Sequence, residues 1–506
     1  MVQEKAIGAL PGHPSKTLGK GIPIYLTSML PISWGFNIHH RRMPAEQLPP
    51  ALKQVAAGSR VVRDDFNWAA VEKVAGVYDF SNYDSLHEKL RNLHMRPYYI
   101  LDYGNAALGC DFRGKAQQPH SKQCIQMFTQ FAITAIKRYA ARWRPEELPV
   151  IWELWNEPNT KAFWGGTSPY GNATEYASLA FSMRDAREAS GLLNSSSHLL
   201  IGPAVAGFGT SNATWEFLDA LSSTGALSTF DALSVHAYRS GPPEGVLDDY
   251  NRLRFLVGGR GASMPIISGE WGWTTCEASP NATNCPRACV ADEGTQAKWL
   301  ARQWLINTLA AVNVSIFYDY VEDCGDASDR ECRFGVTRQP FLNNSIPHQP
   351  KPAFRTAVTL QQHLGGREFH GRLPTSSPFV YVLAFSGRHL AAWSTAAGGA
   401  NSTSCAVADF EKMDCGYYGI TRSQCFDRGC CFGPVDMAGP QCFVHAINYT
   451  RTASIAVDAV ERNQCWLVVN LVHNESAKLA CAVDGQLQLR VDDNVRVLIP
   501  QTHSNQ

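Results

Sequence analysis

Short apolar runs alternate with longer amphipathic stretches between about Trp34 and Leu360. The short runs are rich in β-branched and aromatic residues, which is typical of buried strands. In the longer stretches, such as residues 128–139 and 297–305, apolar residues recur at the spacing of one helix face. Eight runs have strand character: ISWGFNIHH, SRVVRDDF, RPYYILDYG, VIWELWNEP, HLLIGPAVAG, DALSVHAYR, PIISGEWGW and VSIFYDY. This alternation predicts an α/β fold, a closed (β/α)8 TIM barrel.

The C-terminal part of the chain has a different pattern, with short runs that alternate apolar and polar residues. These runs are FVYVLAFSG, HLAAWSTA, ASIAVDAV, QCWLVVNLV and LRVDDNVRVLIP. They predict an antiparallel β-sandwich at residues 363–403 and 444–506, interrupted by a small cysteine-dense insert at residues 404–443. The predicted boundaries leave residues 31–362 for the barrel and residues 1–30 as an N-terminal extension.

Polar residues follow several of the predicted barrel strands. Glu157 follows the fourth run, His236 and Tyr238 the sixth, and Glu270 the seventh, while Arg63 is placed at the end of the second. In such barrels the catalytic groups come from the C-terminal ends of several strands. We therefore expect these side chains to meet at one mouth of the barrel.

Two of these residues, Glu157 and Glu270, are carboxylic acids. Glu157 is flanked by Trp155 and Pro158, and burial against them is expected to raise its pKa, as a general acid requires. Glu153 points the same way but lies about 13 Å deeper, at about 3.3 Å per residue, so we expect a structural acid with a partner. A pair of carboxylates at a barrel mouth suits glycoside hydrolysis.

Metal binding is the alternative chemistry for paired carboxylates, and His39, His40 and His236 could add ligands. The histidines lack metal-site spacings such as H-E-x-x-H, so we expect no metal and no cofactor. Aromatic residues near the strand ends offer faces for sugar rings or ordinary packing: Tyr103, Trp155, Trp164, Trp271, Trp273 and Tyr320.

Charge and cysteine content narrow the class of protein. With 45 basic and 45 acidic residues and no basic run, the chain is a poor match for nucleic-acid binding. Apolar runs fall short of the about 20 residues of a membrane span. Fifteen cysteines and nine N-glycosylation sequons predict an extracellular or secretory-pathway glycoprotein. The first residues, MVQEKAIGALPGHPSKTLGKG, lack a secretory signal pattern, and we interpret this start as trimmed or incomplete.

The motifs WNEPN and ISGEWGW resemble the acid/base and nucleophile signatures of glycoside hydrolase clan A, whose members are retaining enzymes on (β/α)8 barrels. The resemblance covers about residues 30–360 and looks most like families 5 and 39. It implies that Glu157 is the acid/base and Glu270 the nucleophile. Asn156 would then bind the sugar 2-hydroxyl.

The same resemblance implies further roles around the two acids. Arg63 and Tyr238 would supply the donors that keep the nucleophile ionised, and His236 would contact substrate or the acid/base, or be a structural histidine. Trp271 and Tyr320 are expected to orient or bind the sugar, with Tyr320 in FYDY taking the place of a tryptophan that many clan members carry.

The insert contains six cysteines in 40 residues, a density typical of disulfide scaffolds. Zinc is the rival interpretation, and it is disfavoured by the adjacent Cys430 and Cys431 and the lack of flanking histidines. The spacing and the words DCGYYGIT and GCCF resemble the P-type trefoil domain. That resemblance implies the disulfides Cys405–Cys431, Cys415–Cys430 and Cys425–Cys442, which spacing alone leaves among fifteen pairings.

Nine cysteines lie outside the insert. Cys110 with Cys124, and Cys465 with Cys481, are expected as local pairs. The others follow the seventh and eighth strands: Cys276, Cys285, Cys289, Cys324 and Cys332. The sequence as a whole predicts a secreted retaining β-glycosidase or β-glycanase with an oligo- or polysaccharide substrate. The alternative is a catalytically silent glycan-binding or surface-structural glycoprotein, and the oligomeric state stays open.

Overall fold

The computed structural model describes most of the barrel and the C-terminal sheet. The described segments are residues 29–110, 121–165, 172–193, 196–258, 264–275, 292–326, 329–338, 348–375, 379–395, 464–472, 478–483 and 486–501. Backbone strands are described in addition at residues 412–414, 431–432, 442–445 and 451–456. The predicted N-terminal extension falls almost wholly outside these segments.

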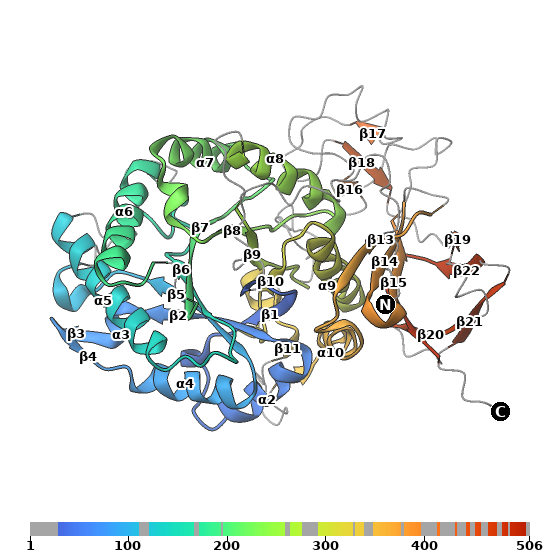
Figure 1. Cartoon of the computed structure of the whole chain (residues 1–506), viewed down its shortest axis with the longest axis horizontal. Coiled ribbons are helices and arrows are strands. Elements are labelled where there is room, and N and C mark those ends of the chain that lie inside the picture. The colour runs from blue at the N-terminus through green and yellow to red at the C-terminus, as the bar shows by residue number, and fades with distance from the viewer. Residues whose placement is uncertain are drawn as a thin grey trace, which may run out of the picture.

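Parallel strands close into a barrel in the order β1-β10-β9-β8-β7-β6-β5-β2 (Figure 1). The strands are β1 (Ser33–Asn37), β2 (Val61–Asn67), β5 (Arg96–Asp102), β6 (Val150–Leu154), β7 (His198–Val205), β8 (Ala232–His236), β9 (Ile266–Trp271) and β10 (Val314–Phe317). Each matches one of the predicted apolar runs. The closed eight-stranded barrel is therefore confirmed.

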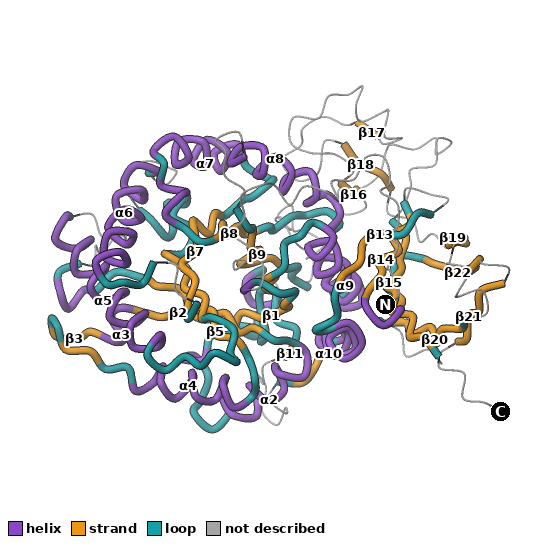
Figure 2. The backbone as a smooth tube through the Cα atoms, in the orientation of Figure 1, coloured by secondary structure: helices purple, strands orange, loops and turns teal. Residues whose placement is uncertain are grey.

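Helices cover the outside of the barrel (Figure 2). They are α2 (Leu48–Gly58), α4 (Ser81–Asn92), α5 (Lys122–Ala140), α6 (Ala173–Ala189), α7 (Asn212–Thr224), α8 (Val246–Gly258), α9 (Glu293–Leu309) and α10 (Pro352–Leu364). Shorter elements lie in the connections: α3 (Trp68–Val71), β3 (Glu72–Val74), β4 (Val77–Tyr78), η1 (His40–Arg42), η2 (Ala106–Leu108), η3 (Ala226–Thr229), η4 (Pro243–Gly245), η5 (Glu331–Arg333), β11 (Thr337–Arg338) and β12 (Gln349–Pro350).

Successive residues of each strand point to opposite faces of the sheet, and both faces are buried, which explains the continuously apolar strand sequences. Tyr98 and Ile151 belong to the cluster that fills the barrel, whereas the next residues, Tyr99 and Trp152, belong to the core between strands and helices. Both faces of a parallel sheet are covered in such a fold, so neither face needs polar residues. Polar side chains are thereby left for the strand ends, where the chemistry is expected.

The C-terminal domain is built on an antiparallel sheet in the order β13-β14-β15-β23-β20-β21-β22-β19. Its strands are β13 (Phe369–Arg372), β14 (Val380–Phe385), β15 (His389–Ser394), β19 (Arg451–Ala456), β20 (Cys465–Asn470), β21 (Lys478–Val483), β22 (Gln486–Val491) and β23 (Arg496–Pro500), with η6 (Ser386–Arg388) between β14 and β15. The sheet folds over itself: Val382 of β14 and Leu489 of β22 share one core cluster. The predicted sandwich is thus one continuous sheet.

The opposite face of β14 and β15 packs on the barrel, beside α9 and α10 (Figure 1). Trp393 donates from its indole N–H to Glu244 Oε1 at 2.8 Å, and Glu244 also pairs with the buried Arg302 of α9. Lys298 pairs with Asp493 at 3.0 Å. The contact is both apolar and ionic, so barrel and sheet form one packed unit.

The insert contributes a three-stranded sheet in the order β16-β18-β17, from β16 (Lys412–Asp414), β17 (Cys431–Phe432) and β18 (Cys442–His445). The pairing of its six cysteines lies outside the described side chains, as do Cys276, Cys285 and Cys289. Elsewhere the predicted disulfides Cys110–Cys124 and Cys465–Cys481 are confirmed, and Cys324–Cys332 joins two of the loop cysteines. The exact domain boundaries stay a prediction.

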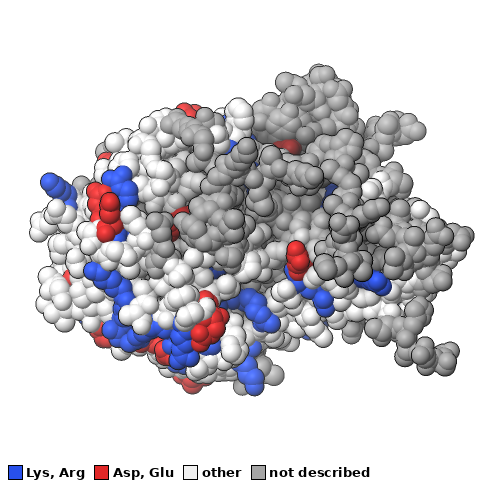
Figure 3. Space-filling view, in the orientation of Figure 1, with Lys and Arg blue, Asp and Glu red and all other residues white. Residues whose placement is uncertain are grey.

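Charged side chains of both signs are intermingled on the visible face of the barrel (Figure 3). This mixture agrees with the zero net charge of the chain. Within the described segments, we find no helix that combines the length and the apolar character of a membrane span.

Candidate active site

The end of β6 carries Glu157 in a sharply turned backbone. Trp155 has φ 68° and Glu157 has φ 45°, both in the left-handed region that side chains other than glycine rarely adopt. Trp155 is fixed by its indole N–H, which donates to the carbonyl oxygen of Phe163 at 2.9 Å. Such backbone strain persists only where surrounding contacts hold it, and it gathers at functional sites.

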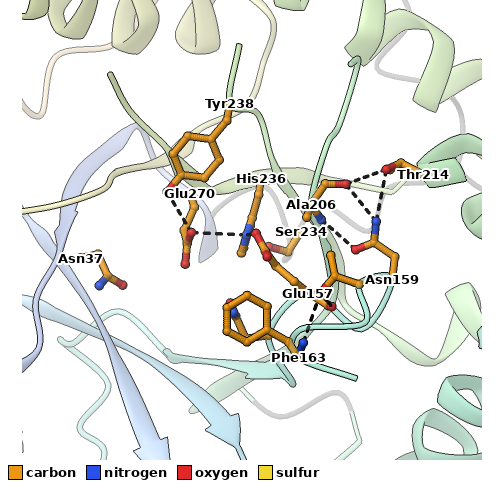
Figure 4. Close-up of polar contacts among 12 residues, drawn as sticks. Asn37, Glu157, Asn159, Phe163, Ala206, Thr214, Ser234, His236, Tyr238 and Glu270 are labelled. Carbon is orange, nitrogen blue, oxygen red and sulfur yellow. Dashed lines mark hydrogen bonds and ion pairs between the residues drawn. The ribbon is translucent and has the colours of Figure 1, made fainter. Parts of the chain in front are cut away.

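The loop after Glu157 is held to the end of β7. The Asn159 side chain donates to the Ala206 carbonyl oxygen and accepts from the Ala206 amide, both at 2.9 Å (Figure 4). Thr214 of α7 donates to the same carbonyl at 2.6 Å. These contacts tie the acid-bearing loop to two neighbouring elements of the barrel.

Arg63 is the cation at the centre of the site. It donates through Nε to Glu153 at 2.9 Å, through Nη1 to Glu270 and to Asn37 Oδ1 at 3.1 Å, and through Nη2 to Asn156 Oδ1 at 3.1 Å. Its guanidinium is fully buried. The fork of donors therefore fixes the nucleophile candidate and two amides at once.

Glu153 is a structural acid, as predicted. It is completely buried below the mouth and accepts hydrogen bonds from Arg63, from the Tyr98 hydroxyl at 2.6 Å and from Ser234. A buried carboxylate needs such partners because its desolvation is otherwise costly. Glu153 thus supplies the negative charge that balances Arg63.

His236 lies between the two acids (Figure 4). Its Nδ1 is 2.8 Å from Glu157 Oε1 and 3.5 Å from Glu270 Oε2, and its Nε2 is 3.4 Å from Arg63 Nη2. Because the Glu157 carboxyl oxygen accepts, His236 Nδ1 carries a proton and donates it to Glu157. The Tyr238 hydroxyl donates to Glu270 Oε2 at 3.0 Å.

The two acids have opposite pKa shifts. Burial raises the pKa of Glu157 above its usual value, although the hydrogen bond and charge of His236 oppose this. Burial would also raise the pKa of Glu270, but the charges of His236 and Arg63 and the hydrogen bonds from Tyr238 and Arg63 outweigh it and lower the pKa. Environments that separate the pKa values of two carboxyl groups in this way suit one group to act as an acid and the other to stay ionised.

The carboxylates are also close together. One oxygen of Glu157, one of Glu270 and one nitrogen of His236 all lie within 4.8 Å of one another. This triad could in principle hold a cation, but Arg63 already contacts Glu270 and places a positive charge there. The donor set therefore fits proton transfer and covalent chemistry better than metal binding.

Most of the predicted site residues meet in this cluster: Arg63, Asn156, Glu157, His236, Tyr238 and Glu270. Arg63 is the third residue of β2 rather than its last, because the strand continues to Asn67. A long side chain brings its guanidinium up to the mouth.

Two aromatic residues that were expected to bind or orient the sugar are buried. Trp271 is fully buried, its indole N–H donates to Ser315 Oγ at 2.9 Å, and its ring packs edge-on against Trp304 of α9. Tyr320 is also fully buried and lies against Phe36 and His348. Neither ring is exposed to solvent, and Trp155, Trp164 and Trp273 are buried as well.

Asn37 and Tyr318 also lie at the site, although the sequence did not single them out. Asn37 bridges Arg63 and His39, and the partly exposed Tyr318 places its hydroxyl 3.3 Å from His39 Nε2. The sequence held a weak signal for Asn37, which is a polar residue inside the first predicted apolar run and is the last residue of β1. Partly exposed Tyr103 stacks on Phe163 at 6.0 Å and 15°, on the side of the mouth where Glu157 lies.

The insert matches a known family. Residues 405–445 match the model of the Trefoil (P-type) domain. Trefoil factor 3 of Sus scrofa is 42% identical over 45 residues, which are 9% of this chain and 56% of that protein. Trefoil factor 3 of Canis lupus familiaris is 39% identical over 64 residues, which are 13% of this chain and 76% of that protein.

Solved structures share the fold of the barrel and sheet. A family 39 glycoside hydrolase from Bacteroides cellulosilyticus WH2 matches with a TM-score of 0.62 at 17% identity, over 94% of this chain and 82% of that one. A monomeric β-xylosidase from Caulobacter crescentus CB15 matches with a TM-score of 0.59 at 15% identity, over 94% of this chain and 97% of that one. The fold of this chain is therefore that of structurally known glycoside hydrolases.

Proposed function

We propose that this chain, which contains a P-type trefoil domain beside a barrel with a glycoside hydrolase fold, is a secreted retaining β-glycosidase or β-glycanase. The observation that carries the proposal is the close pair of glutamates with opposite pKa shifts at the barrel mouth. The disulfides and the trefoil domain support a secretory location.

In the first step, the ionised Glu270 attacks the anomeric carbon. The bond from that carbon to the leaving oxygen breaks while Glu157 transfers its proton to this oxygen, and a covalent glycosyl-enzyme ester forms on Glu270. Arg63 and Tyr238 hold Glu270 in place and keep it ionised. His236 donates to Glu157 and fixes the carboxyl group beside the leaving oxygen.

In the second step, Glu157 acts as a base. It removes a proton from water, the water oxygen attacks the anomeric carbon, and the ester bond to Glu270 breaks. Asn156 assists both steps: its amide oxygen accepts from Arg63, so its NH2 group is available to a sugar hydroxyl. A hydrogen bond of this kind strengthens as charge develops on the sugar.

Retention is favoured over inversion by the separation of the acids. Inverting enzymes place their carboxyl groups about 6.5 to 9.5 Å apart to admit a water, whereas retaining enzymes hold them about 5 to 5.5 Å apart. An approach of oxygens within 4.8 Å supports the shorter class.

The test is a mechanism-based label. The folded, disulfide-intact protein is incubated with activated 2-fluoro β-glycosides of several sugars, and the adduct is located by peptide mass spectrometry. We expect a covalent sugar on Glu270. Failure of every sugar to label, together with no hydrolysis of longer glycans, would favour the silent glycan-binding alternative.

A further inference from the structure

Three N-glycosylation sequons lie on the described part of the barrel, and their asparagines have different surroundings. These sequons begin at Asn172, Asn212 and Asn313. The other six lie outside the described residues, at Asn194, Asn281, Asn343, Asn401, Asn448 and Asn474. A glycan is attached to the side-chain nitrogen Nδ2, so the contacts of that atom decide whether the folded protein can hold one.

Asn172 is exposed and caps the N-terminus of α6 through its side-chain oxygen. Its Oδ1 accepts from the backbone N–H of Thr174 at 3.0 Å and from that of Glu175 at 3.2 Å. An asparagine at the N-cap uses its oxygen and leaves its nitrogen unused. A glycan on Nδ2 would therefore keep the cap of the helix intact.

Asn212 is exposed at the first position of α7. We find no hydrogen bond from its amide to any residue that the structure describes, so its Nδ2 is also available. Thr214, the third residue of this sequon, is buried and donates its hydroxyl to the Ala206 carbonyl oxygen at 2.6 Å. The sequon is recognised through that hydroxyl, so the glycan must be added before α7 packs on the barrel.

Asn313 is half-buried, and its Nδ2 is engaged. It donates to the Leu30 carbonyl oxygen at 2.7 Å, and Leu30 is itself buried. Ser315, the third residue of this sequon, is fully buried and accepts from Trp271 and Asn307. A sugar on Nδ2 would compete with the Leu30 carbonyl for the same space, so we expect folded molecules to lack a glycan here.

The two exposed sequons lie on the barrel face that carries the candidate active site. Since α6 follows β6 and α7 follows β7, both helices begin at the face where those strands end. Both also contact the loop that follows Glu157: Thr214 accepts from Asn159 at 3.2 Å, and Glu175 accepts from the Trp164 indole at 3.2 Å. The third sequon instead directly precedes β10 and lies at the opposite face.

We propose that Asn172 and Asn212 carry N-linked glycans, which flank the Glu157 side of the barrel mouth, and that Asn313 is unmodified. This inference rests on the proposed function, which includes the secretory location. The sugar donor is an oligosaccharide joined to a lipid by pyrophosphate. Nδ2 forms a bond to the anomeric carbon, the bond from that carbon to the pyrophosphate oxygen breaks, and the amide loses one proton.

The test measures the occupancy of each site in the full chain, secreted by eukaryotic cells behind a cleavable signal peptide. Peptide N-glycosidase in heavy-oxygen water releases each glycan and converts its asparagine to a heavy-oxygen aspartate, which peptide mass spectrometry locates. A sample without this enzyme corrects for spontaneous deamidation. We expect the heavy-oxygen label at Asn172 and at Asn212 in most molecules, and none at Asn313. A missing label at Asn172 or at Asn212, or a label at Asn313, would overturn the inference.

Two variants check the sites independently. Asn172→Asp keeps an oxygen acceptor at the N-cap of α6, where a carboxylate is also favoured, and Asn212→Asp keeps a side chain of the same shape. The intact mass of each variant should fall by one glycan, whereas the control Asn313→Gln should keep every glycan. An unchanged glycan mass in either aspartate variant would contradict the assignment. If a variant is not secreted, the occupancy measured on the unaltered chain decides.

The glycan sites and the proposed hydrolysis are decided by different measurements. Labelling of Glu270 by a 2-fluoro glycoside tests the hydrolysis, whatever the state of the sequons. Unmodified Asn172 and Asn212 in a protein whose Glu270 is labelled would refute the glycan sites and leave the glycosidase assignment intact. Glycans at both sites in a protein that no sugar labels would support the glycan sites and count against the hydrolysis.

Discussion

Glu157 and Glu270 carry the same functional group but have different neighbours. Glu157 accepts one hydrogen bond from His236, whereas Glu270 contacts Arg63 and Tyr238. Both are largely removed from water, which favours the neutral form. The number of donors therefore decides which glutamate keeps its proton.

Glu157→Gln removes the side chain that we propose as proton donor and base. Hydrolysis of substrates with poor leaving groups should fall by about 10²- to 10⁴-fold, while glycosylation by an activated aryl glycoside should change little. Azide should then raise turnover of the aryl glycoside, because it attacks without a base, and the product should be a β-glycosyl azide. Steady-state rates and product analysis check this, with Glu175→Gln as a control outside the pair. Full activity of Glu157→Gln on an ordinary glycan would contradict the assignment.

The opposite pKa shifts predict a bell-shaped pH profile of kcat/KM. In the proposed mechanism Glu270 is ionised, so we expect activity to fall as the pH drops through its lowered pKa. In the same mechanism Glu157 is protonated, so we expect activity to fall as the pH rises through its raised pKa. Tyr238→Phe removes a donor that lowers the pKa of Glu270, so the acid limb should move to higher pH.

The matched control for that variant is Tyr78→Phe, on the β4 strand outside the site. This variant should leave the acid limb and the alkaline limb of the pH profile unchanged. If the acid limb of the pH profile does not shift in Tyr238→Phe, a group other than Glu270 controls that limb.

At the residue scale, the sequence predicted which polar side chains meet at the barrel mouth but not which aromatic side chains are exposed there. Glu270 and Trp271 are adjacent on a strand, so they point to opposite faces, and this alternation could have excluded Trp271 from the cleft. Tyr318 and Tyr320 are two residues apart and follow the end of β10. Alternation along a strand gives residues two positions apart the same orientation, so the sequence could not show which of the two tyrosines faces the site.

At the element scale, buried strands were predictable because both faces of a parallel sheet are apolar. The lengths of individual strands were not predictable. Arg63 was placed at a strand end, but β2 continues for four more residues to Asn67, since Asp64 and Asp65 find partners at the mouth. Polar residues inside a strand can be satisfied only by contacts that come from distant parts of the chain.

The Cys110–Cys124 disulfide links the connection after β5 to the first turn of α5. Its cysteines are 14 residues apart, and a loop of this length stabilises the folded state by about 3 kcal/mol, chiefly by restricting the unfolded chain. Replacing both cysteines by alanine should lower the free energy of unfolding by about that amount, measured by chemical denaturation.

The comparison is the Cys465–Cys481 disulfide in the C-terminal sheet, whose cysteines are 16 residues apart. Its removal should cost a similar amount, because the loop lengths are similar. A free energy of unfolding that does not change when Cys110 and Cys124 are replaced would show that the loop-closure argument fails for this connection.

At the scale of the whole molecule, the C-terminal sheet and the barrel share one apolar core. The side chains of β14 and β15 that face the barrel share its apolar core cluster: Tyr381, Leu383, Phe385, Ala391 and Trp393. The sequence predicted a barrel, a β-sandwich and an inserted trefoil domain, but it could not identify the residues of this contact because alternation reveals a buried face but not what covers it. Glu244 lies in η4, which follows the strand-end segment with Tyr238, so the sheet also braces a connection of the active site.

Trp393→Ala should therefore destabilise the entire unit. The substitution leaves a cavity against the barrel and removes a donor from Glu244, which should lower the free energy of unfolding by about 3 to 5 kcal/mol. Calorimetry should show one transition for barrel and sheet, shifted as a whole, with activity lost over the same temperatures. Phe255→Ala on α8 is the matched control, since that ring is 83% exposed and its loss should cost less than about 0.5 kcal/mol. Two separate transitions, with only one shifted by Trp393→Ala, would show that the sheet folds independently and that the packing against α9 and α10 does not couple the domains.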